Sequence, residues 1–336
     1  MKRREFVTLL GGSAVAWPLA VSRADAQSAN LMPKLAIFSP SEPEALMQEN
    51  SENRYYRALF AELRRLGRVA GANLSVTRYG KERSSAGAKA VAAEVVADRP
   101  DCIYVVGPGA LLFKEATDTI PIVALTADPV RQGLVKTLAH PGGNITGVSV
   151  DAGPSIHGKR IALLREMCPR AKKLAFMTFR GLWERQGEEV RAIAQTLGID
   201  VVGYPLDLPA NETIYRDTIA KAKVDGADTI MVGDNPDAMN NRVLIAKLID
   251  ATGLPAIYPF AEFVSAGGLM AYSFDLIELN KRVADDIAMI LNGTNPGGIP
   301  FYQAVKFELS LNLKTARALS LDVPATLLAA ADEVIE

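Results

Sequence analysis

The sequence predicts an α/β protein built from two doubly wound parallel-sheet lobes. Short apolar runs alternate with amphipathic stretches from residue 31 onward, and such alternation builds parallel sheets through right-handed crossovers. About ten strand-like runs precede residue 280, which is more than one sheet of ordinary size contains. A Gly-, Pro- and Asn-rich passage at 126–149 interrupts the alternation, and we interpret it as the crossing from one lobe to the other.

The first lobe is predicted from buried strands and one clear amphipathic helix. The segment KLAIFS (34–39) has the composition of a buried strand. Tyr56, Phe60 and Leu63 then recur at helical spacing until Gly67 ends the pattern. The predicted elements are, in order, strand 34–39, helix 56–66, strand 74–80, helix 88–97, strand 101–107, a short helix ending at 117, and strand 121–126.

The second lobe is predicted from the alternation that resumes at residue 144. Helical spacing is clearest at Ile161 and Leu164, and again near the C-terminus at Val283 and Ile287. The predicted strands are 144–150, 173–179, 200–206, 228–233, 255–260, 269–274 and 304–313. The predicted helices of this lobe are one through 161–167 and those ending at 198, 226 and 253. The C-terminal part adds helix 279–291, which can return to the first lobe, and helix 315–321.

The C-terminal part predicts that the chain crosses between the lobes more than once, because one helix can return to the first lobe before the chain finishes on the second. Several linkers crossing side by side form a hinge, with a ligand cleft between the lobes. The predicted linkers lie near Thr146, Asp275 and Pro300. The predicted lobes are lobe I (31–147 and about 275–299) and lobe II (148–274 and about 300–336).

Residues 1–26 have the layout of a bacterial export signal. Basic residues come first, a short apolar stretch follows, and small residues end at Ala26. Arg3 and Arg4 give the start a twin-arginine form, although the residues alone leave the Sec and Tat routes both open. No cysteine follows the expected cleavage point, so we predict a periplasmic protein, cleaved near Ala26, without a lipid anchor.

Composition argues against several classes of function. The formal net charge of −1 offers no basic surface for nucleic acid, so no nucleic-acid partner is expected. His140 and His157 have no metal-ligand partner at useful spacing, and no nucleophile elbow, Walker loop, G-x-G-x-x-G or C-x-x-C segment is present. We therefore expect a monomer that is not an enzyme and that holds no metal or cofactor.

The candidate site lies in the loops at the carboxyl ends of the predicted strands, where parallel α/β sheets bind ligands. Hydroxyls and amides there suit a carboxylate, two acids suit an ammonium group, and aromatic rings suit an apolar body. The carboxylate candidates are Ser39, Ser41, Gly107 and Gly109, and the ammonium candidates are Asp128 and Asp234. The aromatic candidates are Phe179, Trp183, Phe260 and Tyr272, and the set is completed by Thr126, Asn235 and Asp275.

Each candidate also has a structural explanation. Asp128-Pro129 and Asp234-Asn235-Pro236 are good turn or helix-start sequences, and aromatic residues at strand ends often belong to the core.

Three long segments resemble the extracytoplasmic substrate-binding proteins of ABC transporters, in the tryptophan/tyrosine-type branch. They are ADPVRQGLVKTLAHPGGNITGV (127–148), LPAIYPFAEFVSAGGLMAYSFD (254–275) and KFELSLNLKTARALSLDVPATLLAAADEVIE (306–336). The resemblance implies a class I periplasmic-binding-protein fold with three crossings, the first at Gly142–Gly147. It also implies hinge closure on a small solute and delivery to permease subunits.

The resemblance leaves the ligand open. An amino acid or aromatic carboxylate is favoured, and a branched-chain or other small organic acid is the next choice. The segment VGDNPDAMNN (232–241) is more polar than in many relatives and indicates a different ligand. The alternative functions are a ligand-sensing extracytoplasmic binding protein and, less favoured, a periplasmic enzyme.

Overall fold

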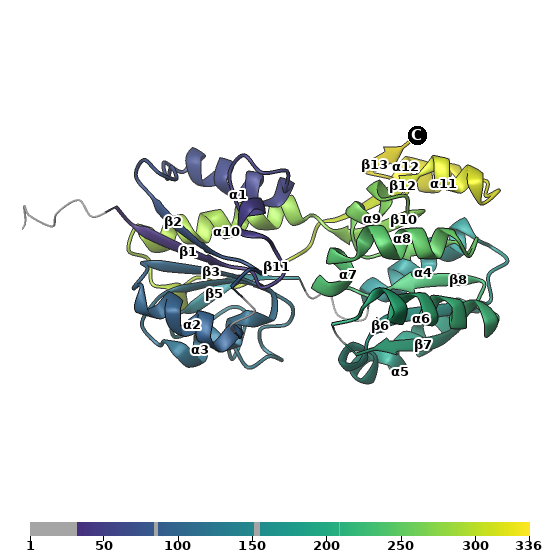
Figure 1. Ribbon diagram of the computed structural model, residues 1–336, viewed down its shortest axis with the longest axis horizontal. Helices are drawn as coiled ribbons and strands as arrows, with labels where there is room; N and C mark the ends of the chain where they lie inside the picture. The colour runs from purple at the N-terminus through teal and green to yellow at the C-terminus, as the bar shows by residue number, and fades with distance from the viewer. Residues whose placement is uncertain (1–31, 84–86, 151–154, 208) are drawn as a thin grey trace, which may run out of the picture. The chain divides into compact units, whose positions relative to one another are not determined.

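The computed structural model describes residues 32–83, 87–150, 155–207 and 209–336 (Figure 1). The predicted export signal at 1–26 lies outside these residues. Within the described ranges, no helix is both long enough and apolar enough to cross a bilayer.

The first sheet has six strands, and every pairing in it is parallel. The strands are rich in β-branched and aliphatic residues because helices cover both of their faces. In spatial order they are β11 (Tyr302–Gln303), β5 (Ile145–Ser149), β4 (Ile122–Thr126), β3 (Cys102–Val106), β1 (Lys34–Phe38) and β2 (Ser75–Tyr79).

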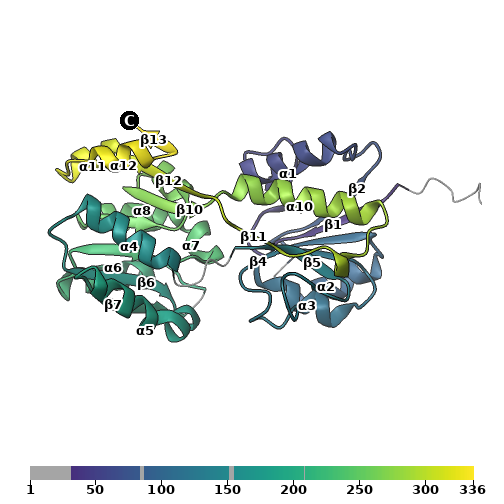
Figure 2. The ribbon, with the colours of Figure 1, turned by 180° about the vertical axis from the view of Figure 1, so that it is seen from behind.

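Two helices cover each face of the first sheet (Figures 1 and 2). Leu35 and Ile37 of β1 pack toward one pair of helices, and Ala36 and Phe38 pack toward the other pair, as strand alternation requires. The first pair is α1 (Arg54–Arg65) and α10 (Leu276–Leu291), and the second is α2 (Ala88–Ala97) and α3 (Ala110–Ala116). Single 3₁₀ turns are η1 (Glu44–Leu46), η3 (Gly107–Gly109) and η4 (Pro296–Gly298).

The second sheet has seven strands, and only the pairing of β10 with β12 is antiparallel. β12 begins a few residues after β11 of the first sheet, so it runs against its neighbour β10. In spatial order the strands are β13 (Glu333–Ile335), β12 (Phe307–Asn312), β10 (Met270–Phe274), β9 (Ala256–Tyr258), β8 (Thr229–Val232), β6 (Lys173–Phe179) and β7 (Asp200–Leu206).

Helices cover both faces of the second sheet as well (Figures 1 and 2). On one face lie α4 (Ser155–Met167), α5 (Arg180–Thr196), α11 (Leu313–Ala318) and α12 (Ala325–Ala330). On the other lie α6 (Glu212–Val224), α7 (Pro236–Asn240), α8 (Arg242–Asp250) and α9 (Ala261–Ser265). Alternate residues of β6 again separate the two cores, with Phe176 on the α4 side and Met177 on the α6 side.

The chain passes between the sheets three times: after β5, after β10 and after β11. The first passage follows Ser149, because β5 pairs with β4 over its whole length. The predicted crossing at Gly142–Gly147 is therefore wrong, since residues 142–144 lead into β5 and 145–147 belong to it. Thr146 accordingly lies inside β5, where its hydroxyl donates to the carbonyl of Ile299 (2.7 Å). The third passage follows Gln303 and therefore comes after Pro300.

Candidate functional site

Several buried side-chain oxygens without a hydrogen-bond partner lie at or just beyond the carboxyl ends of strands. Within the described part of the chain, these include Ser39 after β1, Thr178 at the end of β6 and Glu262 after β9. More than nine in ten buried polar groups in proteins are paired, so an unpaired one marks a position for a ligand or a water molecule. This edge of each sheet is where the sequence predicted the site.

Ser39 and Tyr56 form the first-sheet part of this edge. Both side chains are buried, and neither hydroxyl oxygen makes a hydrogen bond of normal geometry to a described residue. The two hydroxyls are neighbours, and burial together with the negative charge of Glu42 raises the pKa of the Tyr56 hydroxyl. Tyr56 therefore stays a neutral hydroxyl that can donate to a carboxylate. The sequence suggested only a core position for it, because its spacing fits the buried face of α1.

Asn53 fixes the start of α1 and thereby places Tyr55 and Tyr56. Its side-chain oxygen accepts the amide of Tyr55 (2.9 Å) and that of Tyr56 (3.4 Å), which is N-cap geometry. Its amide nitrogen reaches the carboxylate of Glu42 at 3.4 Å.

Asn53→Ala is expected to lower the free energy of unfolding by about 1 kcal/mol, because the first turn of α1 loses its cap. Asn211→Ala, which removes the cap of α6 in the second lobe, should cost a similar amount. Urea denaturation followed by circular dichroism measures both. An unchanged midpoint for Asn53→Ala beside a lowered midpoint for Asn211→Ala contradicts this role of Asn53.

Residues of α1 also contact the second lobe. The hydroxyl of Tyr55 donates a hydrogen bond to Glu262 in the first turn of α9, and Arg54 Nε lies 3.4 Å from the same carboxylate. Burial and the charge of Glu262 raise the pKa of the Tyr55 hydroxyl, so it remains a donor. Sequence analysis missed this contact, since an acid in a first turn is ordinary helix chemistry.

Asp234 lies just beyond β8 and is paired with Arg160 of α4. The Arg160 side chain is 0% exposed, and its two terminal nitrogens contact the two oxygens of Asp234, one of them at 3.1 Å. Arg160 also donates to the backbone oxygens of Tyr272 (2.8 Å) and Pro259 (3.4 Å). One arginine thus fixes the predicted residues Asp234 and Tyr272, together with the segment that leads to Phe260.

The sequence suggested that the Asp234 carboxylate binds an ammonium group. In the structure this carboxylate is paired with Arg160, which neutralises its charge. The side chain is still 26% exposed and has lone pairs left to accept further hydrogen bonds.

Other predicted residues have local roles in the structure. Asp128 accepts the amides of Val130 (3.0 Å) and Arg131 (2.9 Å), which is turn chemistry. The Thr126 hydroxyl donates to Gln132 at 3.0 Å. Asn235 caps α7 by accepting the amide of Ala238 at 2.7 Å.

Asp275 caps α10 at the second crossing and pairs with Lys306 at the third (2.5 Å). The pKa of the Asp275 carboxyl is lowered by Lys306 and by helix amides, against the opposing effect of burial. The ion pair thus joins two of the linkers.

The remaining predicted residues divide between the strand edge and the core. Tyr272 stacks on Phe307, with ring centroids 5.5 Å apart, and Phe179 lies under Arg185. Trp183 is half-buried and packs against Phe176 at the edge of the second core. Gly109 is needed for packing, since a Cβ there would lie 2.6 Å from the Phe38 ring. Gly107 has a positive φ of 81°, and Ser41 is half-buried.

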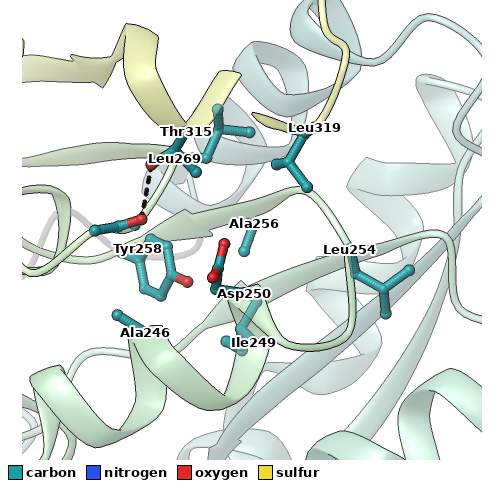
Figure 3. A pocket seen from close by; sticks show the side chains of 11 residues that line it. Ala246, Ile249, Asp250, Leu254, Ala256, Tyr258, Leu269, Thr315 and Leu319 are labelled. Carbon is teal, nitrogen blue, oxygen red and sulfur yellow. Dashed lines mark hydrogen bonds between the residues drawn. The ribbon is translucent and has the colours of Figure 1, made fainter. Parts of the chain in front are cut away.

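A small pocket in the second lobe is a different feature (Figure 3). It lies near the amino ends of β9 and β10, beside Ala256 and Leu269, with Asp250 and Tyr258 facing it. Thr315 donates to the backbone oxygen of Gly267 at its rim (2.9 Å). A volume of about 10 Å³ holds roughly one water molecule, so the pocket is too small for an organic solute. The described residues include no cluster of His, Cys, Asp and Glu suited to a metal ion.

Two lobes, each a mainly parallel sheet between helices, linked by three crossings, define the class: this is the periplasmic-binding-protein fold that the sequence predicted. Residues 46–335 match the family described as "ABC transporter substrate binding protein". The chain belongs to this family, whose members bind a small-molecule substrate for an ABC transporter, and the predicted membership is confirmed.

Individual relatives agree with this membership. The chain is 24% identical over 286 residues to a "Tyrosine-binding protein" of Clostridioides difficile (strain R20291), covering 82% of this chain and 79% of the relative. Two crystal structures each have a TM-score of 0.79 and cover 90% of this chain and 99% of theirs. One is a conserved domain protein of Vibrio cholerae (24% identity), and the other is an ABC domain from Streptococcus pneumonia in complex with L-Trp (21%).

Proposed function

We propose that this protein is the extracytoplasmic binding protein of an ABC importer and that its solute is an aromatic amino acid. The observation that carries the proposal is the pair of buried, neighbouring hydroxyls of Ser39 and Tyr56 at the carboxyl edge of the first sheet, neither of which makes a hydrogen bond of normal geometry to a described residue. The tyrosine-binding relative and the L-Trp complex support the choice of ligand. The predicted export signal at 1–26 supports a periplasmic location. We expect the protein to act as a monomer that delivers its solute to permease subunits.

In this proposal the solute lies between the carboxyl edges of the two sheets. Ser39, Ser41 and Tyr56, with the amides near Gly107 and Gly109, hold its carboxylate through charge-assisted hydrogen bonds, which contribute about 1.5–3 kcal/mol each. In the second lobe, Asp234 is held by Arg160 and accepts hydrogen bonds from the solute. Phe260 and Tyr272 lie beside the aromatic body, and the three crossings allow the lobes to close on it.

Ligand binding to residues 27–336 tests this proposal. At one hundred times the dissociation constant, L-tryptophan or L-tyrosine should stabilise the protein by about 2.7 kcal/mol, measured as a thermal shift. Ser39→Ala should weaken binding about tenfold in isothermal titration calorimetry, because one hydrogen bond to the carboxylate is lost. Ser75→Ala, at the amino end of β2 in the same sheet, is the control and should leave affinity unchanged.

Absence of any thermal shift with L-tryptophan, L-tyrosine or L-phenylalanine contradicts the choice of ligand. Consumption of a bound solute, seen by mass spectrometry of the mixture, favours a periplasmic enzyme instead.

A further inference from the structure

A second set of unpaired polar atoms lies in the second lobe, on the sheet face that α4 covers. Thr178 is 1% exposed and His157 is 3% exposed, and neither Thr178 Oγ1 nor His157 Nδ1 has a hydrogen-bond partner among the described residues. Thr178 faces the same side of β6 as Phe176, two residues earlier, and the Phe176 ring lies 5.2 Å from the His157 ring. Both atoms therefore lie between β6 and α4.

Thr178 also lies directly beside the segment that carries Asp234. The amide of Gly233 donates to the carbonyl of Met177 (2.8 Å), and a Cβ at Gly233 would lie 2.2 Å from Thr178 Oγ1. Only glycine therefore allows Thr178 to pack here. Arg160, one turn after His157 on α4, reaches Asp234 from the same face. His157, Thr178 and the Arg160–Asp234 pair thus share one end of the second sheet.

The hydrogen-bonding state of His157 follows from its neighbours. Burial and the positive charge of Arg160 lower its pKa to about 4, so the ring is neutral at physiological pH, although Asp234 and Gln186 oppose this shift. Nε2 lies 3.2 Å from the side-chain oxygen of Gln186, and we assign the proton to Nε2 on the basis of this contact. Nδ1 is left as an acceptor, while Thr178 Oγ1 can donate.

A group that satisfies both atoms must donate to one and accept from the other, and a hydroxyl does both. We propose that His157 Nδ1 and Thr178 Oγ1 form a hydroxyl subsite beside Asp234 that takes the phenol group of a tyrosine-type solute. The ligand O–H donates to Nδ1, and the Thr178 O–H donates to the ligand oxygen. This inference rests on the proposed function and narrows it, because the subsite favours L-tyrosine over L-phenylalanine.

Titration calorimetry with L-tyrosine and L-phenylalanine tests the subsite. The unaltered protein should bind L-tyrosine about tenfold more tightly, since a buried polar group left unpaired is costly. Thr178→Val keeps the side-chain shape, and it should remove this preference by weakening L-tyrosine about tenfold while changing L-phenylalanine less than about twofold. Thr229→Val is the matched control, because Thr229 is equally buried and unpaired but lies at the amino end of β8. It should leave both affinities unchanged.

Nitrogen NMR adds a readout that a purely structural role would not move. The chain has two histidines, so a His140→Gln sample identifies His157, whose Nδ1 signal should shift with L-tyrosine and not with L-phenylalanine. Equal affinities for the two amino acids, or an equal loss of both in Thr178→Val, would show that the two atoms do not recognise the phenol group and would overturn the subsite alone. Binding of neither amino acid would overturn the proposed function as well.

Discussion

Asp234→Asn is expected to lower the free energy of unfolding by about 3–5 kcal/mol at neutral pH. The change removes the counter-charge of Arg160, whose side chain is fully buried, and an unpaired buried cation is among the costliest defects a protein can carry. The backbone oxygens of Tyr272 and Pro259 still accept from the guanidinium, but they do not neutralise it. Urea denaturation at pH 7, followed by circular dichroism, measures the loss.

A second arginine–aspartate pair provides the control for this prediction. Arg180 and Asp207 make the same two-contact geometry (2.6 and 2.8 Å), but their side chains are 48% and 75% exposed. Asp207→Asn should therefore cost no more than about 1 kcal/mol, as is usual for surface pairs. Equal losses for the two variants would show that the Arg160–Asp234 pair gains nothing from its burial.

Asp286→Asn is expected to raise the free energy of unfolding by about 2–4 kcal/mol at pH 8 and to change it little near pH 4. Asp286 lies on the buried side of α10, and one of its carboxyl oxygens has no described partner. Burial raises its pKa to about 7; Arg282 lowers it and Asp285 raises it further. Asparagine reproduces the shape of the protonated, neutral acid without its ability to ionise.

The sign of this pH dependence follows from proton binding. The unfolded carboxyl ionises near its ordinary value of 3.8, whereas the folded one holds its proton to about pH 7. Between these two pH values the unfolded state binds fewer protons than the folded state. The part of the stability that depends on Asp286 is therefore fully present below pH 3.8 and is lost as the pH rises to about 7. Denaturation midpoints from pH 4 to 8 measure the loss, which should be smaller in Asp286→Asn. Asp217→Asn, an exposed helical control, should keep the slope of the unaltered protein.

Most of the fold was predictable because strands covered on both faces leave continuous apolar runs, and β1, β3, β4 and β6 are such runs. The exceptions have physical causes. β5 is buried along its whole length, as β4 is, so its pattern does not reveal which sheet it joins. β11 and β13 have only two and three residues, too few to show a period. The antiparallel direction of β12 depends on where the third crossing enters, which is a property of the whole chain.

The site was less predictable because its pairing joins residues far apart in the sequence. Ser39 ends one predicted strand and Asp234 follows another, so strand position alone identified them as candidates. Arg160 gave no such signal, since an arginine in an amphipathic helix is usually exposed; its partners lie 74 to 112 residues away. Tyr56 has the same periodicity as the core residues of α1, and only its unpaired hydroxyl distinguishes it.

The late position of α10 in the chain has a consequence for how the protein is made. Leu279, Val283 and Ile287 of this helix cover the same core as α1, yet they leave the ribosome after every strand of the second sheet except β12 and β13. Until α10 is synthesised, α1 alone of these two helices can cover this face of β1 and β3. The first lobe can therefore complete this core only after most of the second lobe has been synthesised.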